Sequence, residues 1–466
     1  MSTEKKKSGN VVAIVTMCFI FAMISFVTNM AAPFGNIWGN QYEWSKMAGN
    51  LMNFAAYLFM GIPAGKMLLK IGYKKTTLAA LAVGFIGICI QYLSSFDFLG
   101  GAAIYVYLLG AFVCGFCVCM LNTVVNPMLN ILGGGGNKGN QLIQTGGTLN
   151  SLTGTLTPLL VGALIGTVTS STSMKDVAPL LFIAMGVFAV AFVIISIVKI
   201  PEPAKERNTT SYEHSAWNFR HFVLGAVAIF FYVGIEIGIP AQVNFFLADA
   251  TEKGAGIAVN GAAIGGAIAA VYWLLMMIGR ACSTAISGKV STRTQMIAVS
   301  SVAIILIAIA IFIPKSTTVN MPGYSAADGF AMFQVPLSCL FLVLCGLCTS
   351  VMWGAIFNLA VEGLGKYTEQ ASGIFMMLVV GGGIMPFIQN LIAKNAGYMV
   401  SYWLVIAMLA YLLYYALIGC KNVKQGHSRR VIDRQTRRAG ASSSESPALR
   451  SPFIIICKSQ QWISLS

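Results

Sequence analysis

The chain has 466 residues, of which 57% are hydrophobic and only 10% are charged, and its mean hydropathy is +0.76. A soluble chain of this length would carry about 25% charged residues and would divide into domains with polar surfaces. The composition excludes that class and predicts a protein embedded in lipid. The net charge is +15, but the basic residues fall in short runs between apolar segments, where charge sets membrane orientation. Part of the excess also lies in the last forty residues, so we expect no nucleic-acid partner.

Twelve apolar segments are long enough to cross a membrane as helices. They lie at residues 11–33, 47–69, 77–94, 103–131, 141–168, 177–199, 221–247, 262–287, 296–314, 335–361, 371–393 and 398–419. The first could pass for a signal peptide, but its apolar run is too long and no clear cleavage site follows, so we interpret it as an uncleaved span. The sequence therefore predicts an all-α membrane protein with twelve transmembrane helices.

Basic residues are distributed unevenly between the loops. If the N-terminus is cytoplasmic, the inside loops hold twelve Lys and Arg residues and the outside loops hold five Lys residues. Because cytoplasmic loops carry an excess of Lys and Arg, we predict that both termini are cytoplasmic.

The longest polar interruption in the helical region runs from Ile200 to His221 and separates six spans from six. The motif Cys-Gly-x-Cys occurs at residues 114–117 and again at 345–348, which fits a duplicated six-span unit. We predict an N-terminal six-helix bundle over 1–199, a cytoplasmic linker over 200–220, a C-terminal six-helix bundle over 221–419 and a disordered cytoplasmic tail over 420–466.

Amide side chains occur in the middle of several spans. Unpartnered polar groups are costly in hydrocarbon, so these side chains should face the bundle interior or a watery cavity. Asn122, Asn126 and Asn130 recur every fourth residue and share one face of the fourth span. They could line a cavity for a solute with hydroxyl groups, or they could simply join helices by hydrogen bonds. Further amides come from both halves, which favours a central site: Asn29, Gln144, Asn150, Gln242, Asn244, Asn358, Gln389 and Asn390.

Two residues that lie clearly within spans carry a full charge, Glu236 and Arg280. With a rise of about 1.5 Å per residue, they lie about 21 Å and 10 Å from the cytoplasmic edge, so a direct pair is not assumed. Glu236 is the candidate for ion coupling or substrate contact. Arg280 is the candidate for a tether at the inner gate. Trp273 is one of several aromatic residues that could stack on a sugar ring, although most membrane aromatics pack or anchor at interfaces.

Other function classes have little support. A membrane-embedded enzyme needs clustered nucleophiles, bases or metal ligands, whereas all three histidines lie in loops or at span edges. The glycine-rich run at 133–139 has no Ser or Thr after a Gly-Lys pair, so we expect no nucleotide drive. A sensing receptor would need a longer signalling domain. We expect neither a cofactor nor a metal site.

Several segments resemble known transporters. Gly65-Lys-Met-Leu-Leu-Lys-Ile-Gly-Tyr-Lys-Lys75 resembles the signature between spans two and three of the major facilitator superfamily, with Leu69 in place of the usual Asp. Five more segments resemble the fucose–galactose–glucose:proton symporter family, at residues 122–127, 148–151, 232–236, 272–280 and 360–365. The resemblance implies two six-helix bundles that work by alternating access, and a neutral hexose or deoxyhexose bound near mid-membrane. It also implies a monomer in the cytoplasmic (inner) membrane.

The resemblance also suggests functional residues. The two acids that serve proton coupling and substrate binding in the fucose-transporting member fall on Asn29 and Asn122, and an amide does not titrate. Coupling to a proton, to another cation or to no ion is therefore open, with Glu236 as the remaining deep carboxylate and Arg280 at the gate. We expect the substrate to be bound by Asn29, Asn122, Asn126, Asn150, Trp273, Asn358 and Gln389. The segment 427–466 resembles nothing in the family.

Overall fold

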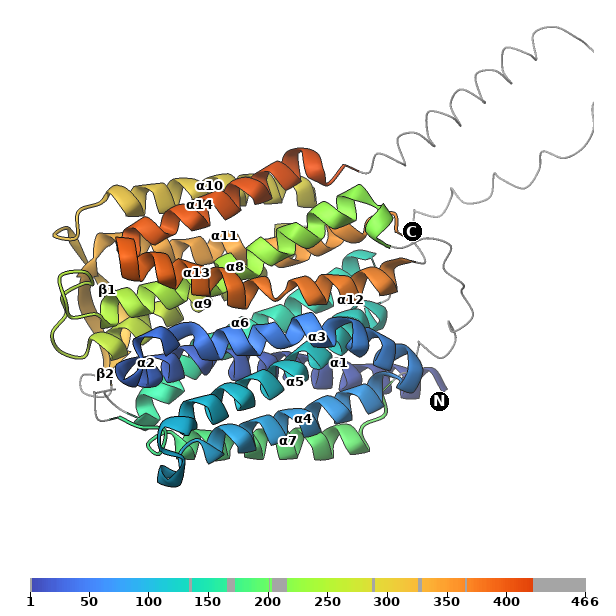
Figure 1. Cartoon of the computed structure of the whole chain (residues 1–466). Helices are drawn as coiled ribbons and strands as arrows, with labels where there is room; N and C mark the ends of the chain where they lie inside the picture. The colour runs from blue at the N-terminus through green and yellow to red at the C-terminus, as the bar shows by residue number, and fades with distance from the viewer. Residues whose placement is uncertain are drawn as a thin grey trace, which may run out of the picture. The chain divides into compact units, whose positions relative to one another are not determined.

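The computed structural model describes residues 2–133, 136–165, 172–200, 202, 216–286, 290–325, 329–364 and 367–421. The predicted tail at 427–466 and most of the predicted linker lie outside these residues. Each of the twelve predicted spans coincides with one helix or with two helices in line, as Figure 1 shows. Long apolar runs become helices because a helix satisfies its backbone polar groups internally where no water is available.

The elements before residue 200 are α1 (Ser2–Asn29), α2 (Ala31–Gln41), η1 (Glu43–Met47), α3 (Ala48–Ile71), α4 (Tyr73–Leu93), η2 (Asp97–Ala102), α5 (Ala103–Leu132), α6 (Gly136–Ile165) and α7 (Ala178–Ile197). The elements after it are η4 (Ala216–Asn218), α8 (Arg220–Ala248), α9 (Gly261–Ile286), α10 (Thr292–Phe312), β1 (Thr318–Ser325), β2 (Gly329–Pro336), α11 (Leu337–Val361), α12 (Thr368–Leu378), α13 (Gly381–Ala396), α14 (Tyr398–Tyr414) and the π-helical turn η6 (Tyr415–Gly419).

Ten helical segments in the described part of the chain are long and apolar enough to cross a membrane by themselves. The helices α3 and α6 are not among these ten; α3 contains Lys66 and Lys70, and α6 contains Gln144 and Asn150. Both helices pack between other helices: α3 contacts α5, α12 and α13, while α6 contacts α1 and α9. The amides of α6 are buried (Gln144) or half-buried (Asn150), whereas Lys66 and Lys70 of α3 are exposed.

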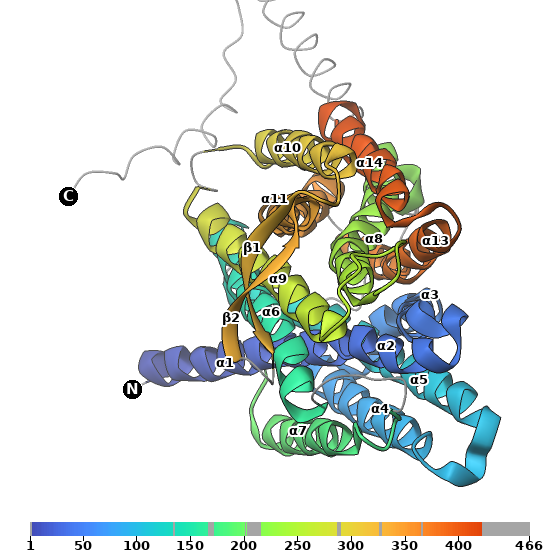
Figure 2. The same cartoon turned by 90° about the vertical axis from the view of Figure 1, so that its left-hand side faces the viewer.

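The helices of the two halves form two groups in Figure 2. In the first half α4 packs against α5 and α7, and in the second half α10 packs against α11 and α14. The halves meet where α6 packs against α9 and where α3 packs against α12 and α13. This arrangement confirms the predicted fold class. It also brings side chains from both groups of helices together in the interior.

The first predicted span is broken, which the sequence analysis missed. The helix α1 ends at Asn29, Met30 is a turn residue, and α2 begins at Ala31. Pro33 has no N–H to donate to the carbonyl of Asn29, so the continuous hydrogen-bond ladder stops there. The break places Asn29 at a helix end.

The eleventh predicted span is also two helices. The segment α12 ends at Leu378 and α13 begins at Gly381. Pro386 cannot donate to the carbonyl of Gly382, and that carbonyl instead accepts a hydrogen bond of 2.8 Å from Nδ2 of Asn50 on α3. A buried amide of the first half therefore satisfies a backbone group of the second half.

An antiparallel hairpin occupies the region between the ninth and tenth spans, where the sequence predicts a loop. The strands β1 and β2 pair from Thr318↔Pro336 to Ser325↔Gly329, and β1 packs against α9. Figure 2 shows the hairpin across one end of the helices. We call this end, which also holds η1, the hairpin end.

The opposite end contains a tight turn at Gly72 between α3 and α4, and we call it the Gly72 end. Gly72 has a φ of 86°, a conformation that favours glycine. The carboxylate of Glu202 accepts hydrogen bonds from the backbone N–H groups of Tyr73 (2.7 Å) and Lys74 (3.0 Å). Glu202 thus caps the start of α4, where a helix favours negative charge.

Candidate functional site

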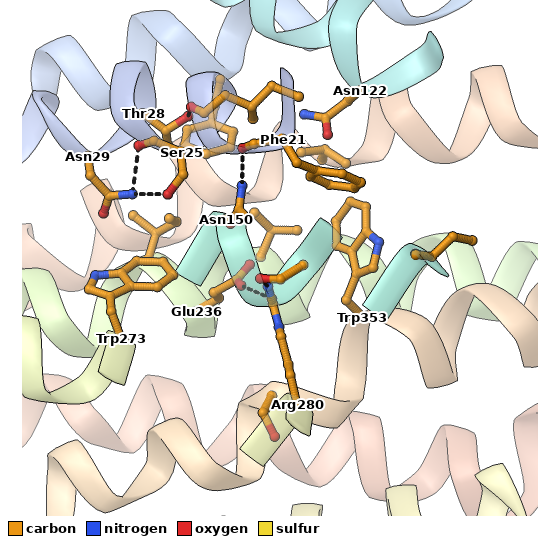
Figure 3. Close-up of a pocket in the computed structure, with 18 of the residues that line it drawn as sticks. Phe21, Ser25, Thr28, Asn29, Asn122, Asn150, Glu236, Trp273, Arg280 and Trp353 are labelled. Atoms are coloured by element: carbon orange, nitrogen blue, oxygen red, sulfur yellow. Dashed lines mark hydrogen bonds and ion pairs between the residues drawn. The ribbon is translucent and has the colours of Figure 1, made fainter. Parts of the chain in front are cut away.

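A pocket lies at the centre of the helical unit, where side chains of both halves meet (Figure 3). Its volume of about 100 Å³ fits a small solute and excludes a macromolecule. The first half contributes residues of α1, α3, α5 and α6, and the second half contributes residues of α8, α9 and α11. Of the residues proposed from the sequence, the pocket brings together Asn29, Asn122, Asn150, Glu236, Trp273 and Arg280.

The three asparagines of the pocket are held through their amide nitrogens. Nδ2 of Asn29 donates to the carbonyl oxygen (2.9 Å) and the hydroxyl (3.1 Å) of Ser25. Nδ2 of Asn122 donates to the hydroxyl of Tyr57 at 2.8 Å, and Nδ2 of Asn150 donates to the carbonyl of Phe21 at 3.0 Å. Because these bonds use nitrogen, each amide oxygen can accept a hydrogen bond from a solute.

Two indole rings add apolar surface beside the amides. Trp273 on α9 is buried, and Trp353 on α11 is half-buried. Gly154 of α6 leaves room for Trp273, since a Cβ there would lie 3.2 Å from the indole. Trp353 packs edge-on against Phe375 with ring centroids 6.0 Å apart. Rigid aromatic faces of this kind suit the apolar face of a ring-shaped solute.

Glu236 and Arg280 form a direct ion pair, contrary to the sequence-based depth estimate. Arg280 Nη2 lies 3.3 Å from Glu236 Oε1, and the two side chains are only 8% and 13% exposed. The depth estimate assumed that both helices are perpendicular to the membrane and that their cytoplasmic ends lie at the same depth. The ion pair shows that these two assumptions are not both correct. Arg280 Nη1 also donates to the carbonyl of Gly147 at 2.6 Å, which connects α9 with α6.

Three other residues proposed from the sequence do not line this pocket. Asn126 points its amide at the carbonyl of Asn122 (3.0 Å), Gln389 is fully buried on α13, and Asn358 is half-buried on α11. Conversely, the pocket contains Ser25 and Thr28, which the sequence analysis did not single out. Ser25 precedes Asn29 by one helical turn, a spacing that could have identified it.

A second cavity, of about 780 Å³, opens at the hairpin end. Its lining is strongly polar and includes Glu43 and Lys46 from the first half and residues 249–253 from the second. Nearby, Glu43 pairs with Lys394 of α13 at 2.9 Å. The hydrogen bond from Lys394 holds the pKa of Glu43 below its ordinary value. The two halves are therefore also in contact outside the spans.

In the described part of the chain, no group of three His, Cys, Asp or Glu side chains is placed to hold a metal ion. The cysteines of the two Cys-Gly-x-Cys motifs are buried within α5 and α11. Burial among helices is the ordinary environment of a small packing residue.

Fold and pocket together define a polytopic membrane protein with a small polar chamber between two groups of helices. The family model described as Major Facilitator Superfamily matches residues 12–385. The chain therefore belongs to the major facilitator superfamily.

Relatives and a solved structure match about nine tenths of the chain. It is 30% identical over 430 residues to the glucose/galactose transporter of Brucella abortus biovar 1 (strain 9-941), covering 90% of this chain and 96% of the relative. It is 26% identical to a putative glucose/galactose transporter of Helicobacter pylori (strain ATCC 700392 / 26695), covering 89% and 98%. The crystal structure of FucP, a transporter of this superfamily, in the outward conformation has a TM-score of 0.65 and 17% identity, covering 88% and 98%.

Proposed function

We propose that the chain is a secondary transporter, not an enzyme, and that it moves a neutral monosaccharide across the cytoplasmic membrane by alternating access. The substrate is a hexose or deoxyhexose such as glucose, galactose or fucose. The names of the Brucella and Helicobacter relatives, a glucose/galactose transporter and a putative one, support this substrate class. The chain acts as a monomer, with residues 1–199 and 221–419 as the two moving bundles.

The central pocket is the observation that carries this proposal. Asn29 of α1, Asn122 of α5 and Asn150 of α6 line the chamber together with two indoles from α9 and α11. Hydroxyl groups can donate to the amide oxygens while the apolar face of a sugar ring stacks on an indole. Because the lining comes from both halves, relative movement of the halves would expose the bound sugar to one side and then the other.

Coupling to a proton, or to another cation, is assigned to Glu236. Asn29 and Asn122 lie in the pocket but cannot titrate, whereas Glu236 is a carboxylate in the same lining. Protonation would remove its charge and break its pair with Arg280. Arg280 also bonds to Gly147 across the halves, so it is the proposed gating residue. One alternative is a sugar uniporter without proton coupling, which the two amides at the family's acidic positions favour. Another is a transporter of a different small polar solute.

Transport in proteoliposomes tests both proposals. Purified protein should exchange labelled glucose, galactose or fucose with internal sugar, and a pH gradient should drive accumulation. The Glu236→Gln variant should lose the pH-driven accumulation while hexose exchange continues, because exchange needs no net proton movement. Absence of exchange with every hexose would overturn sugar transport. Equal accumulation by the variant would remove Glu236 from coupling, and wild-type exchange without accumulation would indicate a uniporter.

A further inference from the structure

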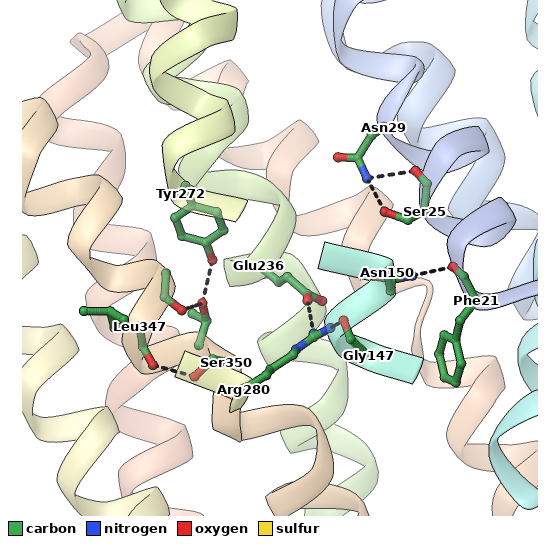
Figure 4. A network of polar contacts seen from close by, with 12 residues as sticks. Phe21, Ser25, Asn29, Gly147, Asn150, Glu236, Tyr272, Arg280, Leu347 and Ser350 are labelled. Carbon is green, nitrogen blue, oxygen red and sulfur yellow. Dashed lines mark hydrogen bonds and ion pairs between the residues drawn. The ribbon is translucent and has the colours of Figure 1, made fainter. Parts of the chain in front are cut away.

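Arg280 is held in the pocket by two independent contacts, which Figure 4 shows. Nη1 donates to the carbonyl of Gly147 at 2.6 Å, and Nη2 lies 3.3 Å from Glu236 Oε1. A Cβ at position 147 would lie 3.1 Å from Nη1, so glycine allows this close approach. The Gly147 contact does not involve Glu236 and can hold the guanidinium in place without it.

The described lining of the pocket has a formal charge of zero. Glu236 and Arg280 are its ionised side chains at neutral pH, and the other polar members are amides, hydroxyls and a phenol. Without Glu236 the pocket would present a buried guanidinium aimed at the solute. A guanidinium is planar and matches the geometry of a carboxylate, and both groups gain strength where water is excluded.

We infer that Glu236 sets the charge selectivity of the pocket by acting as the internal counter-ion of Arg280. This inference rests on the proposed sugar transport. Glu236 occupies the position on the guanidinium that a substrate carboxylate would take, so a sugar acid such as a hexuronate meets both a blocked partner and a like charge. Because the carboxylate of Glu236 is paired with Arg280, the described lining offers no unpaired carboxylate to the ammonium group of an amino sugar. Neutral sugars are selected because either ionic class leaves a buried charge unpaired.

Ligand binding to the purified full-length chain tests the inference without any ion gradient. Trp273 and Trp353 line the pocket, so intrinsic tryptophan fluorescence can report binding of glucose, galactose, glucuronate and galacturonate. In the wild type each uronate should bind at least about tenfold more weakly than its hexose. Glu236→Gln, which removes the carboxylate beside Arg280 and leaves the guanidinium charge in the pocket, should tighten uronate binding by about tenfold or more.

The double variant E236Q/R280Q is the matched control, because its pocket is neutral again. It should lose the gain in uronate binding. If E236Q binds uronates no better than the wild type, or if the double variant keeps the gain, the inference is overturned. Should E236Q be unstable, its thermal unfolding is measured with and without glucuronate, because a ligand that binds the folded state raises the midpoint. A midpoint that glucuronate leaves unchanged also overturns the inference.

The converse variant gives a second readout. Arg280→Gln leaves Glu236 without its cation, so at a pH below the pKa of the amine, glucosamine should gain affinity relative to glucose by about tenfold. No gain would contradict the role of the pair in selectivity. The two proposals fail differently: a wild type that binds no hexose would overturn sugar transport, whereas the order of uronate affinities among the variants tests charge selection alone.

Discussion

Asn122 and Asn126 carry the same side chain one helical turn apart on α5, yet their surroundings differ. Asn122 lines the pocket and bonds to Tyr57, whereas Asn126 is buried behind it and bonds to the carbonyl of Asn122. The amide oxygen of Asn126 is buried with no partner among the described residues. One of the two amides is therefore placed for a solute and the other for the helix.

Replacement of each residue by alanine should separate these roles. Asn122→Ala should weaken hexose binding by about 1–3 kcal/mol, because it leaves a sugar hydroxyl without its acceptor. Asn126→Ala should leave the dissociation constant unchanged and alter the thermal unfolding midpoint instead. Tryptophan fluorescence and thermal unfolding of the purified variants measure the two quantities. Unchanged affinity with lower stability in both variants would identify Asn122 as interhelical glue.

The sequence identifies the polar residues of the spans, but it does not give the direction in which each side chain points. A span of hydrophobic residues fixes its own length, while the rotation of its helix depends on neighbours far away in the chain. For this reason the sequence does not distinguish Asn29 and Asn150, which line the pocket, from Gln389, which does not. The ion pair of Glu236 and Arg280 was missed for a similar reason, because depth was counted along each helix alone.

Helix α9 packs against α8 through a surface that requires a small residue. A Cβ on Gly265 would lie 2.6 Å from the carbonyl oxygen of Asn244, whereas nothing lies within 4 Å of a Cβ on Gly266. The two adjacent glycines therefore provide a matched pair on one helix.

We expect Gly265→Ala to lower the free energy of unfolding by about 1–3 kcal/mol, because the added methyl group must push α8 away. Gly266→Ala should be neutral or stabilising by up to about 1 kcal/mol, because alanine is the better helix former. Thermal unfolding in detergent compares the two. Equal effects would show that α8 and α9 do not approach each other as closely as described.

Hydropathy predicted where the helices are, and the observed bounds mostly agree within a few residues. Hydropathy does not predict the breaks at Met30 and between α12 and α13, because the residues at both breaks (Met30, Val379 and Val380) are apolar and leave the apolar run uninterrupted. Hydropathy also does not predict the β1–β2 hairpin, whose eight-residue strands lie between two strongly apolar spans.

For the whole molecule, the distribution of basic residues predicts that the Gly72 end is cytoplasmic. Lys75 is exposed near that end, and Lys253 is exposed in the loop before α9, near the hairpin end. With cysteine introduced at each position, a membrane-impermeant maleimide should label residue 253 in intact cells and residue 75 only after permeabilisation. The chain without an introduced cysteine is the control, because the maleimide could also label the native cysteines. Labelling in the reverse order would invert the topology.

The hydrogen bond between Asn50 and the carbonyl of Gly382 implies that water takes part when the two halves separate. It joins α3 of one half to α13 of the other and is buried. If the halves part at the hairpin end, Pro386 still gives the carbonyl no helical donor, and an unsatisfied carbonyl costs about 1–3 kcal/mol. A water molecule must then replace the amide, so opening is a hydration step.

Sugar exchange should slow when water activity is lowered with an osmolyte too large to enter the chamber. The Asn50→Ala variant, which lacks the amide, should slow less at the same osmolyte concentration. Equal sensitivity of the two proteins would show that this bond stays closed during transport.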